Sequence, residues 1–117
     1  MSNVLKRRER YMQDGLPTRV GGIAANMARV GSISAWPETM NVAFDLLEES
    51  KFFIEWIAME AELETTVALI DLQLQLSLWQ RQLGTSWNND VSRAEIGRRA
   101  KEYSNDLLQR SGLLDGR

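Results

Sequence analysis

The fold of this chain is decided by residues 63–83, which read LETTVALIDLQLQLSLWQRQL. Because an α-helix has 3.6 residues per turn, apolar residues spaced alternately three and four positions apart share one helix face. The segment is therefore predicted to be a helix that buries this face against other helices. The residues with this spacing are Leu69, Leu72, Leu76, Trp79 and Leu83.

A second apolar stripe runs along the same segment and consists of Leu63, Val67, Ile70 and Leu74. Residues 70–78 also alternate between apolar and polar, which is a strand pattern. We prefer the helix, because Gln, Leu, Ala and Glu dominate the surroundings and the first stripe extends past both ends of the alternating run. A helix that is apolar on two faces is central in a bundle or contacts a second subunit.

The same spacing recurs on both sides of this segment, in residues 20–30 and 96–107. The pattern predicts an all-α protein of about four helices, arranged as an up-and-down bundle or as a helical dimer. We expect a basic N-terminal arm at residues 1–14, the helical bundle at 15–112 and a C-terminal tail at 113–117. The two further stripes are Val20, Ile23, Met27 and Val30, and Ile96, Ala100, Tyr103 and Leu107.

The first core helix is predicted at about residues 17–33 and contains two adjacent glycines, Gly21 and Gly22. The pair costs roughly 2 kcal/mol of helix propensity relative to alanine. Such a cost predicts a compensating gain, namely the close approach of a neighbouring helix or of a bulky ring. The pair is not a phosphate-binding loop, because no strand precedes it and no Gly-Lys-Ser/Thr ending follows.

Helical periodicity then continues from about residue 38 to residue 83 without Pro or Gly. A single helix of that length would measure ~69 Å, which is too long for a compact domain of this size. We therefore expect a bend or tight turn between Ala58 and Glu64. A loop is predicted at 84–90, with Ser92 and Glu95 as the capping box of a last helix that ends near Ser111 and has Gly112 as its C-cap.

The composition excludes several chemistries, because the chain contains neither cysteine nor histidine. Disulfides, thiolate metal sites, Cys nucleophiles and imidazole bases are all absent. Catalysis would have to rest on carboxylates, Lys, Arg, Tyr, Ser or Thr. Neither a signal peptide nor a transmembrane segment is visible, so we expect a cytoplasmic protein with no membrane association.

Charge is distributed unevenly, at +4 for residues 1–29, −8 for 30–80 and +2 for 81–117. An acidic middle can pack beside basic outer helices, in the same chain or in a second one. Alternatively, the arm binds an acidic partner or nucleic acid. A pI of about 5.2 and a single nearby aromatic, Tyr11, argue against nucleic acid. The basic cluster of the arm is Lys6, Arg7, Arg8 and Arg10.

Four glutamates are the candidate metal ligands: Glu48, Glu49, Glu55 and Glu62. Carboxylates of this kind could bind Mg²⁺ or Mn²⁺, as in all-helical nucleotide pyrophosphohydrolases. The Glu-x-x-Asp motif of those enzymes does not follow here, and Glu-x-x-His pairs are impossible without histidine. The simpler interpretation is a solvated acidic face.

The four tryptophans, Trp36, Trp56, Trp79 and Trp87, are large amphipathic rings of the kind that fill cores or interfaces. Trp36 and Trp87 flank predicted loops and could close the ends of the bundle. Exposed rings would instead indicate a partner site.

Two stretches resemble a known family: LPTRVGGIAANMARV at 16–30 and LLEESKFFIEW at 46–56. They resemble a family of small helical proteins found in cyanobacteria, for which no function is assigned. The resemblance implies a helical, cytoplasmic and non-secreted protein. It supplies no catalytic residues.

The sequence thus predicts a non-enzymatic helical interaction or regulatory protein that self-associates and binds no cofactor. The expected partners are further copies of the chain or another protein. The predicted interface is the first stripe, Leu69, Leu72, Leu76, Trp79 and Leu83. The alternative is a carboxylate-metal enzyme that acts on a phosphorylated small molecule.

Overall fold

The computed structural model describes residues 2–113 of the chain. Within this range it is all-helical, as predicted, and has five α-helices where the sequence predicts about four. The additional helix is the basic arm itself. The elements are α1 (Ser2–Met12), α2 (Leu16–Ile33), the 3-10 turn η1 (Pro37–Thr39), α3 (Met40–Ile57), α4 (Leu63–Ser86) and α5 (Asp90–Ser111).

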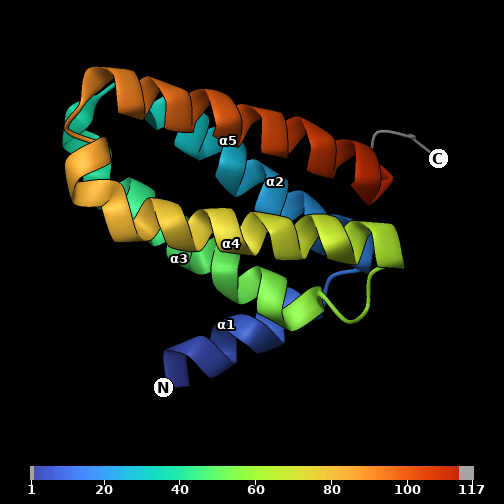
Figure 1. Cartoon of the computed structure of the whole chain (residues 1–117). Helices are drawn as coiled ribbons and strands as arrows, with labels where there is room; N and C mark the ends of the chain where they lie inside the picture. Colours follow the sequence, from blue (N-terminus) through green and yellow to red (C-terminus); the bar gives the residue numbers. More distant parts are fainter. Residues whose placement is uncertain (1, 114–117) are drawn as a thin grey trace.

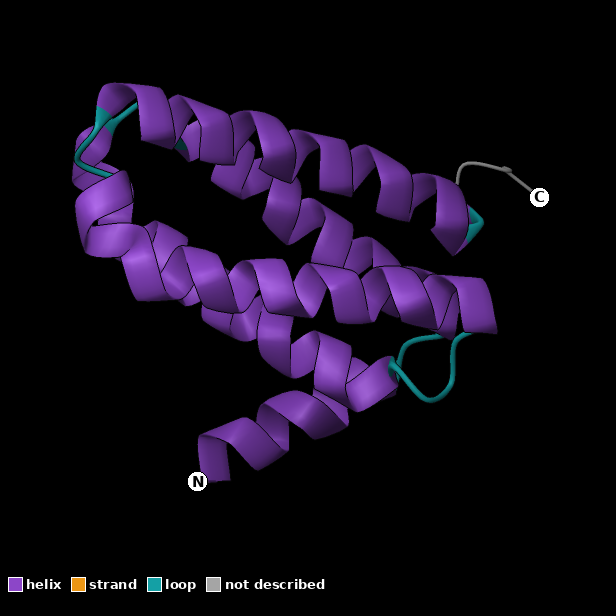
Figure 2. Cartoon of the chain, in the orientation of Figure 1, coloured by secondary structure: helices purple, strands orange, loops and turns teal. Residues whose placement is uncertain are grey.

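Helices α2 to α5 alternate in direction and surround one core (Figure 1). Each packs against the next, and α5 returns to lie beside α2, so the four form an up-and-down bundle within one chain. Short connections join them at the two ends (Figure 2). Helix α1 lies outside the bundle and packs against α3.

The closest helix packing is between α2 and α5. Gly31 of α2 and Gly97 of α5 meet at this crossing, where a Cβ on Gly31 would lie 3.2 Å from the carbonyl oxygen of Gly97. A Cβ on Gly97 would lie 2.6 Å from the Cβ of Ser34. Two backbones can approach this closely only where neither residue carries a side chain.

The predicted Gly21–Gly22 pair serves a different purpose. A Cβ on Gly22 would lie 3.6 Å from the Tyr11 ring and 3.9 Å from the Phe53 ring. The two rings stack on each other with their centroids 3.9 Å apart. These are ordinary contact distances, so the rings lie beside the pair without requiring glycine at position 22; the tighter position is Gly21, where a Cβ would lie 2.5 Å from Leu113 Cδ1. The stacked rings hold α1 against α3.

The break between α3 and α4 is confirmed at residues 58–62, where no Pro or Gly marks it. The turn is held by hydrogen bonds from Thr66 Oγ1 to the carbonyl oxygens of Ala58 (2.7 Å) and Ala61 (3.1 Å). Arg19 of α2 adds a two-pronged ion pair to Glu60, with N–O distances of 2.8 and 2.9 Å. Contacts from another helix therefore set the position of this turn.

The predicted boundaries between α4 and α5 are wrong. Gly84 lies within α4, which continues to Ser86, because Trp87 carries the buried stripe one turn further. The N-cap of α5 is Asn89, not Ser92: Asn89 Oδ1 accepts a hydrogen bond from the Ser92 backbone N–H at 2.9 Å. Because α5 begins three residues earlier than a Ser92 cap would allow, Asn89 caps the free N–H of Ser92 itself. The predicted C-cap, Gly112, is confirmed by its φ of 82°.

Candidate functional site

The five residues of the predicted interface lie inside the core of the chain. Their side chains are at most 8% exposed and belong to the same cluster as the apolar residues of α2, α3 and α5. A surface of this fold that meets a second molecule has to be formed by other residues. The buried set is Leu69, Leu72, Leu76, Trp79 and Leu83.

The second stripe of α4 lies on the surface, on the face opposite the buried stripe. Its four side chains are 52–77% exposed, Leu78 one turn further on is 48% exposed, and none of the other described helices covers this side of α4 (Figure 1). Monomeric proteins seldom expose a continuous row of large aliphatic side chains. We name this row the α4 ridge; it consists of Leu63, Val67, Ile70, Leu74 and Leu78.

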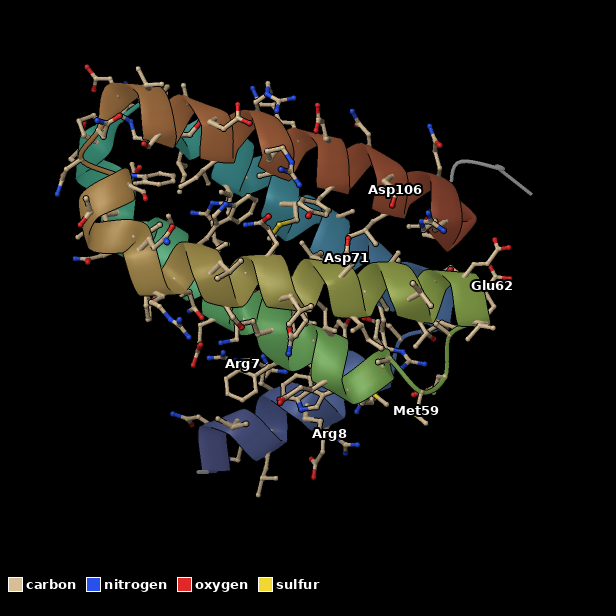
Figure 3. The ribbon with its side chains drawn as sticks, in the orientation of Figure 1. Arg7, Arg8, Met59, Glu62, Asp71 and Asp106 are labelled. Carbon is tan, nitrogen blue, oxygen red and sulfur yellow. The ribbon has the colours of Figure 1, made fainter. Side chains whose placement is uncertain are left out.

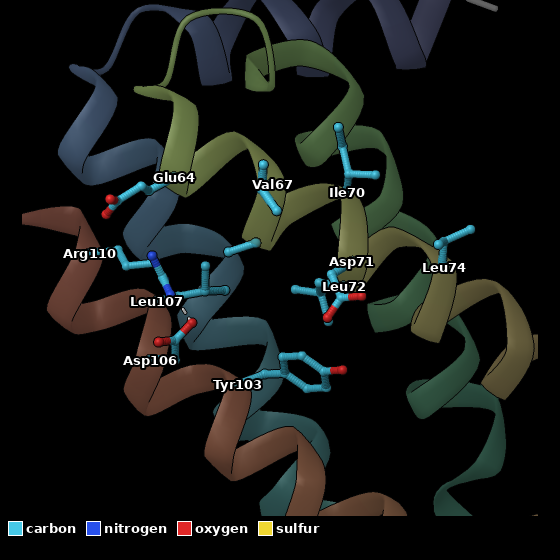
Figure 4. A pocket seen from close by; sticks show the side chains of 11 residues that line it. Glu64, Val67, Ile70, Asp71, Leu72, Leu74, Tyr103, Asp106, Leu107 and Arg110 are labelled. Atoms are coloured by element: carbon cyan, nitrogen blue, oxygen red, sulfur yellow. Dashed lines mark hydrogen bonds and ion pairs between the residues drawn. The ribbon is translucent and has the colours of Figure 1, made fainter.

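A groove of about 420 Å³ runs beside the ridge, between α4 and α5. Among neighbouring helices of the bundle these two approach each other least, so the space between them is incompletely filled. Val67 and Leu74 of the ridge line one wall, and Tyr103 and Leu107 of α5 line the other (Figure 4). The ridge and the groove therefore form one continuous apolar surface.

Charged side chains border the groove, namely Glu64 and Asp71 from α4 and Asp106 and Arg110 from α5. Asp71 and Asp106 face each other across the gap (Figure 3). Arg110 donates from Nε to Asp106 Oδ2 at 2.8 Å, and this hydrogen bond raises the pKa of the guanidinium. The nearby charge of Glu64 acts in the same direction. The rim of the groove is thus acidic except at Arg110.

The four candidate metal ligands do not share one site. Glu49 of α3 accepts a hydrogen bond from Asn26 at 3.1 Å, and Glu48 accepts one from Gln80 at 3.1 Å. Glu62 lies in the turn before α4 and accepts a hydrogen bond from Thr65 at 3.3 Å. Glu55 borders a small hollow beside Glu48. Within residues 2–113, no three carboxylates converge as a metal site.

The basic arm is the helix α1, which is attached to the bundle by the stacked rings of Tyr11 and Phe53. Arg7 lies 3.9 Å from Glu49 of α3, which joins the arm to the acidic middle of the same chain. Figure 3 shows Arg7 and Arg8 on α1, close to α3. Lys6, Arg8 and Arg10 are exposed.

Three of the four tryptophans pack against other side chains of the chain, and one is exposed. Trp87 and Trp79 are buried, and Trp79 contacts Tyr103 edge to face. Trp56 packs beside Phe52 and Tyr11. Trp36 is 54% exposed and does not close the end of the bundle.

Two buried arginines, Arg19 and Arg93, were missed at the sequence level. Arg19 donates to Glu60 and to the carbonyl oxygen of Asp14 (2.9 Å), and so joins the α1–α2 turn to the α3–α4 turn. Arg93 makes a similar set of contacts at the other end of α2. No spacing marks either residue, because each joins partners close in the sequence to one that is far away, Glu60 for Arg19 and Ser34 for Arg93.

The Arg19–Glu60 pair predicts a dependence of stability on pH. The hydrogen bond from Arg19 lowers the pKa of Glu60 below its usual value of 4.5. A carboxyl with a lower pKa in the folded state stabilises the fold above the unfolded pKa, and this contribution is lost as the pH falls through the folded pKa. We expect Glu60→Gln to lower the free energy of unfolding at pH 7. It should have little effect once the pH has fallen below the pKa that Glu60 has in the folded state.

Urea unfolding between pH 7 and pH 3 measures this effect. Glu95→Gln is the control, because Arg98 lowers the pKa of Glu95 in the same way at a separate, exposed site. In the double variant, the reductions in unfolding free energy caused by Glu60→Gln and by Glu95→Gln should add. A Glu60→Gln variant that loses as much stability on acidification as the unsubstituted protein would show that the pair contributes nothing.

Comparison with known protein families, curated proteins and solved structures finds no match to this chain. The resemblance of residues 16–30 and 46–56 to a cyanobacterial family stays a prediction. None of the described helices is long and apolar enough to span a membrane.

Proposed function

We propose that this protein is a non-catalytic helical interaction protein, that it self-associates, and that the α4 ridge is its contact surface. The observation that carries the proposal is the ridge itself, an unbroken row of five aliphatic side chains on the outer face of α4. Covering such a row removes apolar surface from water, at roughly 25 cal/mol per Å².

The area of the ridge sets the expected strength of association. Five aliphatic side chains, each about half exposed or more, offer on the order of 400 Å² per copy. The total from two copies, roughly 800 Å², lies below the ~1,200 Å² of a standard stable interface. The walls of the α4–α5 groove add to this area. We therefore expect a reversible dimer with a Kd in the micromolar range or weaker.

The double substitution Val67→Glu with Leu74→Glu tests the proposal. It places two charges in the middle of the ridge and should weaken dimerisation by about a thousandfold, since four aliphatic contacts of ~1 kcal/mol each are lost per dimer. Light scattering coupled to size exclusion, over a series of concentrations, should show the unsubstituted chain approaching twice 13.3 kDa and the variant remaining at 13.3 kDa.

The matched control is Asn105→Glu with Gln109→Glu, which adds the same charge to exposed positions of α5. This variant should dimerise as the unsubstituted chain does. Circular dichroism should show both variants folded, because every substituted side chain is exposed. A chain that stays monomeric at millimolar concentration, or a ridge variant that still dimerises, would refute the proposal.

A further inference from the structure

We infer that two copies pair through α4 in antiparallel orientation, about a two-fold axis that passes α4 between Ala68 and Leu69. This inference rests on the proposed function and specifies its geometry. The first four of the five ridge residues, Leu63, Val67, Ile70 and Leu74, are separated by four, three and four positions. This spacing reads the same in both directions along the helix.

A two-fold interface requires the same patch on both copies, with each contact made twice. In the antiparallel pair, Leu63 meets Leu74 of the second copy and Val67 meets Ile70 of the second copy. Each of the four ridge residues therefore faces an aliphatic partner, in the layers that spacings of three and four produce between helices. The four layers extend over about 16 Å of helix.

Exposed apolar side chains also lie beyond these layers. Leu78 lies one turn further along the ridge, past the level at which α4 of the second copy begins. Met59 in the α3–α4 turn is 93% exposed, the highest value among the exposed large hydrophobic residues of the described chain.

Charge favours the antiparallel orientation over the parallel one. The N-terminal end of α4 carries Glu60, Glu62 and Glu64, so parallel helices would place these carboxylates together and would align the two helix dipoles. In the antiparallel register Glu64 lies level with Gln73 of the second copy, so the carboxylates at the N-terminal ends of the two α4 helices are kept apart.

Single cysteines test the register, because the chain has no cysteine of its own. We propose Leu63→Cys and Leu74→Cys, both at exposed positions, treated with a short bismaleimide. The antiparallel pair brings the two thiols together only when the variants are mixed. At a local concentration that is roughly millimolar rather than micromolar, the mixture should give on the order of a thousandfold more cross-linked dimer than either variant alone.

The possible outcomes separate this inference from the proposed function. Cross-linking of each variant with itself, and not with the other, would indicate parallel helices and would overturn the inference while leaving the α4 ridge as the contact surface. A dimer that cross-links in neither way would overturn both the register and the ridge. A chain that light scattering shows to be monomeric would refute the proposed function itself. Glu9→Cys, on the exposed side of α1, controls for random collision.

Discussion

Replacing Arg93 by alanine is expected to lower the free energy of unfolding by about 4 kcal/mol, since buried acceptors lose a charged donor and a cavity is left. Arg93 is 8% exposed and lies where α2 ends, α4 ends and α5 begins. Its guanidinium donates to the carbonyl oxygens of Ser34 and Trp87 and to the Asp90 carboxylate, each at 2.9 Å.

Helix ends explain why the effect is large. The last carbonyl groups of a helix have no partner within it and form the negative end of the helix dipole. Ser34 and Trp87 are the C-caps of α2 and α4, so Arg93 serves two helix ends at once. Water cannot take the place of Arg93 at the Trp87 carbonyl oxygen, because Trp87 is fully buried.

Arg98→Ala is the matched control for Arg93→Ala. Arg98 also pairs with carboxylates, Glu95 and Glu102, but all three side chains are more than half exposed. Exposed ion pairs are screened by water and contribute little to stability, so this variant should lose far less than Arg93→Ala. Chemical denaturation of both variants measures the difference. Equal losses for Arg93→Ala and Arg98→Ala would show that the contacts of Arg93 add nothing beyond a surface ion pair.

Gly97→Ala is expected to destabilise the chain by about 2 kcal/mol, although alanine is favoured over glycine in a helix by about 1 kcal/mol. The added Cβ would lie 2.6 Å from the Cβ of Ser34, and a Cβ position cannot be moved by rotating a side chain. Relief therefore requires α2 and α5 to separate, and this is the closest packing in the bundle.

Gly84→Ala provides the comparison in the opposite direction. Gly84 lies within α4, and apart from its own helix no described residue comes within 4 Å of the position a Cβ would take. Here the helix propensity acts alone, and the variant should gain about 1 kcal/mol. Thermal unfolding of the two variants should give melting temperatures that move in opposite directions. A Gly97→Ala variant that is more stable than the unsubstituted chain would contradict the packing at this crossing.

The contrast between these two glycines shows where sequence-level prediction succeeds and fails. Local spacing alone predicts that residues 17–33 and 63–83 are helices, and that Gly112 ends the last one. It also identifies both stripes of α4. It does not tell whether a stripe is buried within the chain or against a second copy, because both stripes have helical spacing and only the packing of α2, α3 and α5 buries one of them.

For this reason the predicted interface residues lie in the core, and the surface available to a second copy is the other stripe. The same limit applies to the two ends of the bundle. Arg19 and Glu60 are 41 positions apart, and Arg93 and Ser34 are 59 positions apart. No local pattern contains information about such pairs.

The sequence by itself determined that this chain is helical, that it lacks thiol and imidazole chemistry, and that one of its helices is apolar on two faces. These properties follow from residue type and from spacing along 3.6-residue turns, which depend only on near neighbours. The tertiary structure alone decided which face of α4 stays exposed, which glycine marks a helix crossing and which arginines join the ends of the bundle. Those properties depend on which segments meet, and that is settled by how the whole set of apolar faces can be buried at once.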